Sequence, residues 1–161
     1  MNFRAKLLSR EQFPAWREQL RSAGKKLVAT NGCFDLLHLG HVTYLENARK
    51  QGNALLVGIN SDSSVRELKG PNRPVNNEGD RALVVAALES VDAVFIFSEK
   101  AATRFLSLAK PDIYIKGGDY TLETLNQEER RTVENTGGKI TIIPFVPGKS
   151  TTTILEKISR L

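Results

Sequence analysis

The stretch that decides the fold is KLVATNGCFDLLHLGH, which occupies residues 26–41. Its first five residues are mostly apolar, a pattern typical of a buried strand. A glycine-containing loop follows, and we expect a helix to begin near Gly40. A strand, a loop and a helix in this order form the first half of a βαβ unit, in which successive strands run parallel.

The same alternation of strand and helix patterns continues along the chain. Apolar runs too short for amphipathic helices predict five strands, at residues 26–30, 54–60, 93–97, 112–116 and 139–143. Apolar residues at helical spacing predict two stripes that face the core, one of Leu83, Val84, Ala87 and Leu88 and one of Val42, Leu45 and Ala48. The sequence therefore predicts an α/β fold with a five-stranded, mostly parallel sheet.

The length of 161 residues, with 40% hydrophobic residues, suits a single domain with one core. We expect that domain to span residues 1–161, with residues 1–24 as an N-terminal helical extension. Cys33 is the only cysteine, so neither an intrachain disulfide nor a cysteine-based metal site can form within the chain.

Apolar runs fall far short of the roughly 18 residues that span a bilayer, and the first residues lack the apolar core of a signal peptide. We therefore expect a cytoplasmic protein without membrane contact. The net charge of +5 is moderate, and its Lys and Arg residues are scattered. This pattern suits a small phosphorylated ligand better than a nucleic acid, although a merely soluble basic surface fits the net charge equally well.

Ligands of parallel sheets bind beside the carboxyl ends of the strands, so we expect ligand-binding or catalytic residues in the loop after the first strand. There, His38 and His41 flank Gly40 at the expected helix start. Backbone N–H groups and the helix dipole attract an anion at such a position, and Gly40 has no β-carbon to obstruct a phosphate. A phosphate site is favoured over a purely structural histidine pair. A metal site is the weaker alternative, because no third ligand lies at suitable spacing.

Three further segments have polar residues after predicted elements. Residues 116–119 read KGGD, which fits a nucleotide or sugar pocket and a simple tight turn about equally well. Residues 150–152 read STT and open the last helix, where phosphate binding is favoured somewhat above plain capping by Ser150. Residues 69–79 are dense in Gly, Pro and Asn and predict a surface loop long enough to be functional.

Two charged residues receive less specific interpretations. Asp62 is expected to cap the helix that follows the second strand, in preference to contacting a ligand. Arg81 could pair with carboxylates or reach a phosphate, and the sequence favours neither.

Residues 38–41, HLGH, resemble the H-x-G-H motif of the nucleotidyltransferase superfamily. Further segments resemble, in order, one of its subgroups, the D-glycero-β-D-manno-heptose 1-phosphate adenylyltransferases: NGCFD at 31–35, NSD at 60–62, KGGDY at 116–120 and STT at 150–152. The likeness runs from about Lys25 to the C-terminus. The combination with KGGDY is far more specific than H-x-G-H alone.

The resemblance implies a Rossmann-like α/β/α sandwich that joins ATP to heptose 1-phosphate, forming ADP-heptose for lipopolysaccharide core synthesis and releasing pyrophosphate. It implies catalytic roles for His38, His41 and Lys69. Contacts to ATP are implied for Gly32, Phe34, Gly40, Arg73, Lys116, Gly117, Ser150, Thr151 and Thr152. Asp35, which could also fix its own loop, and Asp119 are implied to bind the acceptor.

Mg²⁺ is expected to arrive with ATP, bound through phosphate oxygens and water, with no metal-binding residue in the chain. In many bacteria this activity is fused behind a sugar kinase, for which 161 residues leave no room, so the free-standing form is expected. Its expected partners are the two small substrates, with no nucleic acid and no membrane, and a homo-oligomer is compatible with the sequence, which does not fix the oligomeric state.

Two alternatives remain open. Related cytidylyltransferases carry an arginine in an R-T-x-G-I-S-T-T stretch, whereas residues 145–152 read FVPGKSTT. The missing arginine argues against cytidine, and a cytidylyltransferase for a small alcohol phosphate such as glycerol 3-phosphate is the first alternative. A non-catalytic nucleotide sensor is the second.

Overall fold

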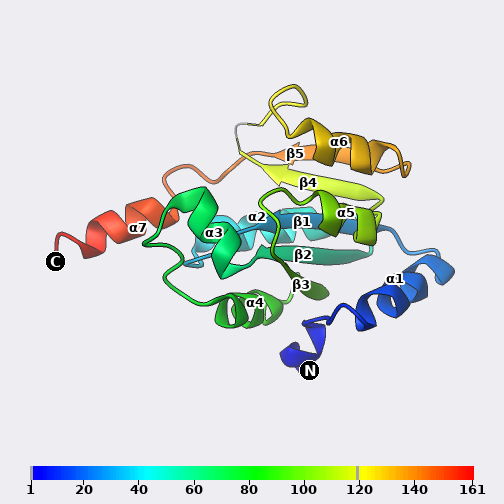
Figure 1. Cartoon of the computed structure of the whole chain (residues 1–161), viewed down its shortest axis with the longest axis horizontal. Coiled ribbons are helices and arrows are strands. Elements are labelled where there is room, and N and C mark those ends of the chain that lie inside the picture. The colour runs from blue at the N-terminus through cyan, green and yellow to red at the C-terminus, as the bar shows by residue number, and fades with distance from the viewer. Residues whose placement is uncertain (1, 119) are drawn as a thin grey trace.

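The computed structural model describes residues 2–118 and 120–161 and contains one five-stranded sheet (Figure 1). Its strands are β1 (Leu27–Gly32), β2 (Ala54–Asn60), β3 (Ala93–Phe97), β4 (Ile113–Gly117) and β5 (Lys139–Ile143). The order across the sheet is β3-β2-β1-β4-β5. Every strand pairing in the described residues is parallel, so the expected α/β fold is confirmed and the sheet is more regular than the predicted mostly parallel one.

The helices alternate with the strands as the sequence pattern indicates. A 3-10 turn, η1 (Phe3–Lys6), and α1 (Gln12–Ser22) precede the sheet. The remaining helices are α2 (Leu39–Arg49), α3 (Asp62–Lys69), α4 (Glu78–Ala86), α5 (Thr103–Ala109), α6 (Gln127–Glu134) and α7 (Thr151–Ile158). In the described residues, no helix has both the length and the apolar character that a membrane span requires.

The sheet is buried on both faces, which explains its continuously apolar strands. Along β1, Val28 packs into the core beneath α2 and α4, whereas Leu27 and Ala29 pack into the core beneath α1, α5 and α6. The side chains of a strand alternate between faces, so each strand supplies both layers. The result is a three-layer α/β/α sandwich.

The prediction of which side of α4 faces the core is wrong. Val84 is half exposed, and the buried residues of this helix are instead Arg81, Ala82, Val85 and Ala86. Every position from 82 to 88 is apolar, so periodicity could not choose a face. On α2 the prediction holds for Leu45 and Ala48, which are buried, but Val42 is exposed.

The strand order creates a single reversal point. The chain moves outward from β1 through β2 to β3 and then returns to place β4 on the other side of β1. The helices following β1 and β4 therefore diverge, which leaves a crevice at the carboxyl ends of these two strands.

Helix α7 differs from the other helices in its burial. None of its residues is buried, and Figure 1 shows it extending away from the sheet toward the C-terminus. Ile158, on the apolar side of this helix, is 56% exposed. The N-terminus of α7, in contrast, faces the crevice described next.

Candidate active site

A cavity of about 750 Å³ lies at the carboxyl ends of the strands, where β1 and β4 meet. This volume lies within the usual range for small-molecule sites. Of the residues expected to form the site, the cavity is lined by Gly32, Phe34, Asp35, His38, Gly40, His41, Lys69, Arg73, Lys116, Gly117, Ser150, Thr151 and Thr152. Asp119, the other expected acceptor residue, lies outside the described residues. The structure thus brings these residues together around one cavity.

Phe34 lies in a left-handed backbone conformation, with φ of 45°. This conformation is unusual for a residue with a large side chain and costs of order 1 kcal/mol or more. Burial of the ring offsets the cost: it packs over Gly32, where a β-carbon would come within 2.9 Å of it, and lies 5.2 Å from the His41 ring. The loop after β1 is therefore held in one shape before any ligand binds.

Asp35 holds the neighbouring loop and does not face the cavity freely. Its side chain is 1% exposed, and its carboxylate accepts hydrogen bonds from the backbone N–H groups of Val75 and Asn76 at 2.8 and 3.1 Å. Arg73 donates its Nε to the same carboxylate at 2.6 Å. The structure therefore favours the loop-fixing role of Asp35 over acceptor binding. The same ion pair restricts the Arg73 side chain.

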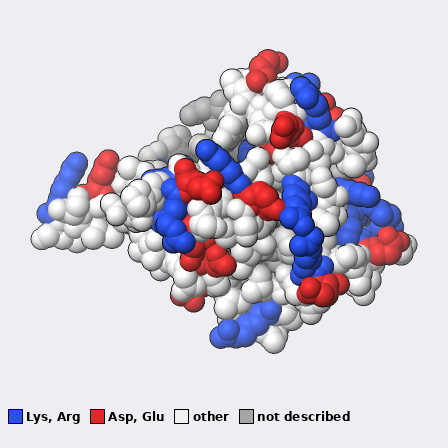
Figure 2. Space-filling model, viewed as in Figure 1, with Lys and Arg blue, Asp and Glu red and all other residues white. Residues whose placement is uncertain are grey.

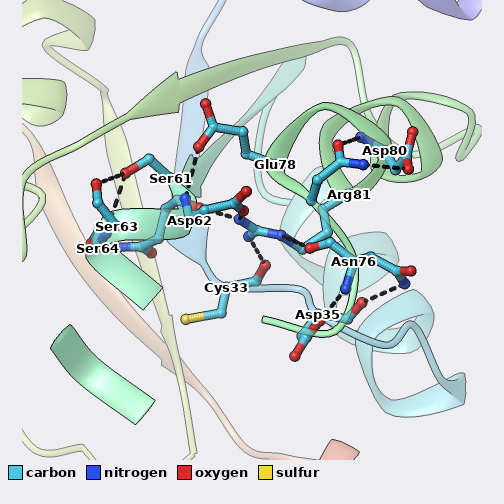
Figure 3. A network of polar contacts seen from close by, with 12 residues as sticks. Cys33, Asp35, Ser61, Asp62, Ser63, Ser64, Asn76, Glu78, Asp80 and Arg81 are labelled. Atoms are coloured by element: carbon cyan, nitrogen blue, oxygen red, sulfur yellow. Dashed lines mark hydrogen bonds and ion pairs between the residues drawn. The ribbon is translucent and has the colours of Figure 1, made fainter. Parts of the chain in front are cut away.

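Arg81, which the sequence left without a role, is the centre of a buried polar network (Figure 3). Its guanidinium donates to the carbonyl oxygens of Cys33, Asn60 and Asn76 and pairs with the Asp62 carboxylate at 2.9 Å. It thereby joins the loop after β1, the end of β2 and residues 73–77. An arginine directly before an apolar helical run was the available signal, but its partners lie up to 48 residues away.

Asp62 was expected to cap α3, and this prediction is wrong. Ser61 caps the helix, because its hydroxyl accepts the N–H of Ser64 at 3.3 Å. The hydroxyl lies one residue earlier and has the geometry of a cap, which frees the Asp62 carboxylate to pair with Arg81.

The imidazoles of His38 and His41 stack with their ring centroids 3.8 Å apart. Gly40 permits this arrangement, because a β-carbon there would come within 3.0 Å of the His38 ring. Burial, more than the neighbouring Lys149, lowers the pKa of His38; burial and then His38 lower the pKa of His41 to about 4. Both rings are therefore neutral near pH 7 and offer hydrogen-bond donors without a fixed charge.

The Nδ1 atoms of both histidines are buried without a hydrogen-bond partner in the described part of the chain. In addition, α2 has no side-chain cap at its N-terminus, where His38 occupies the N-cap position. The free backbone N–H groups of such a helix N-terminus form a site for an anion. The sequence-based reason for Gly40 was incomplete, since this glycine accommodates an imidazole as well as an approaching ligand.

The N-terminus of α7 lies at the same end of the cavity as that of α2. Ser150 caps α7 by accepting the N–H of Thr153 at 3.0 Å, which confirms the expected cap. Thr151 donates its hydroxyl to the carbonyl oxygen of Leu36 at 3.3 Å, and Lys149 lies beside Gly40. Two helix dipoles therefore point their positive ends at one region.

Lys69 stands on a helix and not in the predicted loop. It is the last residue of α3, which ends at Gly70 with φ of 98°. Its side chain lines the cavity from this position. Because Asp35 and Arg81 hold residues 73–76, the part of the expected loop without such contacts is residues 70–72.

A second polar group consists of Asn31, Lys116 and Glu129, which line the cavity, and the buried Tyr114 behind them. Glu129 is 5% exposed, and sequence reasoning missed it because nothing in the charged pattern of α6 marks one carboxylate as buried. Burial, followed by the Glu129 charge, raises the pKa of Tyr114 far above its ordinary value, so its hydroxyl stays protonated.

Gly118, in the KGGD segment after β4, adopts a conformation that only glycine tolerates there. Its φ is 84°, and any β-carbon there would overlap the ring of Phe145. A left-handed residue covered by an aromatic ring can only be glycine.

Surface charge agrees with the scattered pattern in the sequence. Figure 2 shows Lys and Arg interspersed with Asp and Glu over the visible face, with no continuous stripe of one sign. The extended basic footprint of a nucleic-acid interface is missing from this face.

Known proteins resemble this chain over most of its length. "Bifunctional protein HldE" of Geotalea uraniireducens (strain Rf4) is 49% identical over 154 residues, which cover 96% of this chain and 31% of that protein. The protein of the same name from Syntrophotalea carbinolica is 46% identical, over 98% of this chain and 32% of its own length. The chain thus spans about a third of the length of these relatives.

Solved structures agree with the fold. The lipopolysaccharide core biosynthesis protein from Thermoplasma volcanium GSS1 superimposes with a TM-score of 0.63 at 28% identity, covering 76% of this chain and 98% of that one. Pantoate-beta-alanine ligase from Francisella tularensis, at 15% identity and a TM-score of 0.61 over 96% and 78% of the two chains, shares the fold alone. Residues 29–157 match the family described as cytidylyltransferase-like, and the chain belongs to that family.

Proposed function

We propose that the chain is an adenylyltransferase that forms ADP-heptose and pyrophosphate from ATP and D-glycero-β-D-manno-heptose 1-phosphate, in lipopolysaccharide core precursor synthesis. The observation that carries the proposal is the convergence of two helix N-termini and two neutral, stacked imidazoles at one end of the cavity. The relatives named HldE and the structural neighbour titled for lipopolysaccharide core biosynthesis support this choice of product.

The proposed reaction needs no protein nucleophile, because an oxygen of the acceptor phosphate is already charged. The protein must instead align this oxygen with the α-phosphate of ATP and stabilise the charge that develops on the leaving pyrophosphate. His38, His41 and the N-termini of α2 and α7 would bind the triphosphate, and the backbone N–H of Phe34 would lie beside the α-phosphate. Lys69 would add a positive charge from the end of α3.

Mg²⁺ would enter with ATP and neutralise part of the triphosphate charge. The described residues contain no group of three His, Cys, Asp or Glu side chains that could hold a metal ion. The Asp35 carboxylate is also engaged by Arg73 and backbone N–H groups. Coordination through phosphate oxygens and water fits such a site better than a protein cage.

The direct test is pyrophosphate release from ATP or CTP with each of three acceptors: heptose 1-phosphate, heptose 7-phosphate and glycerol 3-phosphate. We expect ATP with heptose 1-phosphate to be preferred by several orders of magnitude in kcat/KM, since buried polar groups discriminate strongly against acceptors that leave them unpaired. Comparable rates with CTP would instead support a cytidylyltransferase. Faster release with glycerol 3-phosphate would refute the proposed acceptor, and absence of turnover would favour the sensor.

The imidazole pair has its own test. His38→Ala and His41→Ala should each lower kcat by about 10²- to 10³-fold, as expected for loss of a transition-state donor. Circular dichroism spectra should show that the variants remain folded. Nearly normal turnover by a folded His41→Ala protein would contradict the proposed role.

A further inference from the structure

We infer that Lys116 and Asn31, which contact Glu129 and Tyr114, form the subsite for the acceptor sugar phosphate. This subsite lies on the face of the sheet opposite α2, the helix that carries His41. The inference rests on the proposed adenylyl transfer. It reassigns Lys116, which the family resemblance placed with ATP, and gives Glu129 the role of a positioning residue.

The first step is the placement of these side chains relative to the sheet. Thr30 of β1 faces α2, because its hydroxyl lies 2.7 Å from the Tyr44 hydroxyl. The next residue, Asn31, is turned to the opposite face, where its Oδ1 lies 2.6 Å from the Tyr114 hydroxyl oxygen. Lys116 lies two residues after Tyr114 on β4 and therefore shares that face.

The second step is the buried frame that holds Lys116. Glu129 of α6 accepts the backbone N–H of Ala102 at 2.7 Å through Oε1 and the Tyr114 hydroxyl at 2.9 Å through Oε2. The Lys116 ammonium lies 3.5 Å from Oε2 of Glu129 and 3.4 Å from Oδ1 of Asn31. The carboxylate thus places a buried negative charge beside the cation.

The third step is the hydrogen-bonding capacity that remains. The two Lys116 contacts are long, so the ammonium keeps donors for a ligand oxygen. The Nδ2 of Asn31 has no hydrogen bond to any residue in the described part of the chain, and both side chains line the cavity. Tyr120, 46% exposed, has its ring centre 5.3 Å from the same ammonium and offers a flat surface beside it. Donors beside an aromatic ring suit a phosphorylated, hydroxyl-rich ligand.

The fourth step is the direction of the reaction. In a phosphoryl-type displacement the attacking and leaving oxygens lie roughly in line on opposite sides of the phosphorus. Pyrophosphate would leave toward the N-termini of α2 and α7, on the α2 face of the sheet. The acceptor oxygen must then approach from the other face, where Lys116 and Asn31 lie.

Steady-state kinetics of pyrophosphate release with ATP and heptose 1-phosphate test the inference. Lys116→Met should raise the KM for the acceptor by about tenfold or more while the KM for ATP changes by less than about twofold. Glu129→Gln keeps the shape and the acceptor oxygen but removes the charge, and should show the same split with a smaller rise. Lys25→Met, an exposed lysine ahead of the amino end of β1, is the matched control and should change neither KM.

The outcomes separate the inference from the proposed function. If the wild type releases no pyrophosphate with any sugar phosphate, the proposed function fails. If the wild type is active but Lys116→Met raises the KM for ATP and leaves that for the acceptor unchanged, the acceptor subsite is wrong. A fall in kcat with both KM values unchanged would also overturn it. Calorimetric titration with a nonhydrolysable ATP analogue provides a readout besides turnover, and its affinity should be the same in Lys116→Met and the wild type.

Discussion

The low pKa of His41 predicts that the protein loses stability in mildly acidic solution. Burial and the adjacent His38 lower this pKa from 6.5 to about 4. As the pH falls below 6.5, the unfolded chain takes up a proton at this imidazole before the folded protein does, so the free energy of unfolding decreases until the pH approaches 4. Above pH 6.5 the contribution is complete.

The magnitude follows from the same two values. The full difference corresponds to about 3 kcal/mol, of which about 2 kcal/mol is lost between pH 7 and pH 5. Because the ring lines a solvent-filled cavity, screening reduces the expected loss to about 1 kcal/mol. Urea unfolding at pH 7, 6 and 5 measures it, and His41→Gln is the comparison, since an amide of similar polarity does not titrate in this range.

We expect the wild type to lose about 1 kcal/mol more than His41→Gln between pH 7 and pH 5. The chain has two histidines, so the double variant with His38→Gln contains no titrating imidazole and should show the shallowest dependence. NMR titration of the ring protons locates the midpoint directly. A midpoint near 6.5, or equal losses in the wild type and His41→Gln, would refute the reasoning.

Three other substitutions test separate features. Arg81→Met should lower the free energy of unfolding by about 3–5 kcal/mol in urea titrations, because it leaves buried carbonyl oxygens and the partly buried Asp62 carboxylate without their partner; a loss below 1 kcal/mol would contradict that account. Gly118→Ala should abolish detectable turnover and lower the melting temperature, since a β-carbon would displace the Phe145 ring, and an unchanged melting curve would count against it. Lys69→Ala should reduce kcat/KM for ATP by about ten- to a hundredfold in the pyrophosphate assay without changing stability, and unaltered kinetics would remove Lys69 from the site.

Local patterns predicted the strands and most helices, and they marked the loop that carries His38 and His41, because these features depend on residues that are close together in the sequence. The apolar strands stand out in the sequence, and the loop that carries His38 and His41 leads directly from a strand into a helix. Ser150 caps its helix through a residue three positions away. Such features require no knowledge of distant parts of the chain.

The features that sequence reasoning missed depend on contacts between distant segments. Arg81 contacts carbonyl oxygens from two other loops, and its burial fixes which side of α4 faces the sheet. Glu129 differs from the exposed Glu128 only in pointing toward Tyr114. Asp35 was correctly placed at the site, but only the fold shows that residues 73–76 occupy its carboxylate.

Helix α7 brings hydroxyl and N–H groups to the cavity without burying any residue of its own. The cores on the two faces of the sheet would remain intact if this helix detached, whereas the anion site would lose one of its two walls. If ATP bridges α2 and α7 as proposed, it binds only the docked arrangement, and its measured affinity is scaled by the docked fraction. Such a ligand would stabilise the docked position of the C-terminal segment. Resistance of that segment to a protease would then increase with the fraction of protein that has ligand bound.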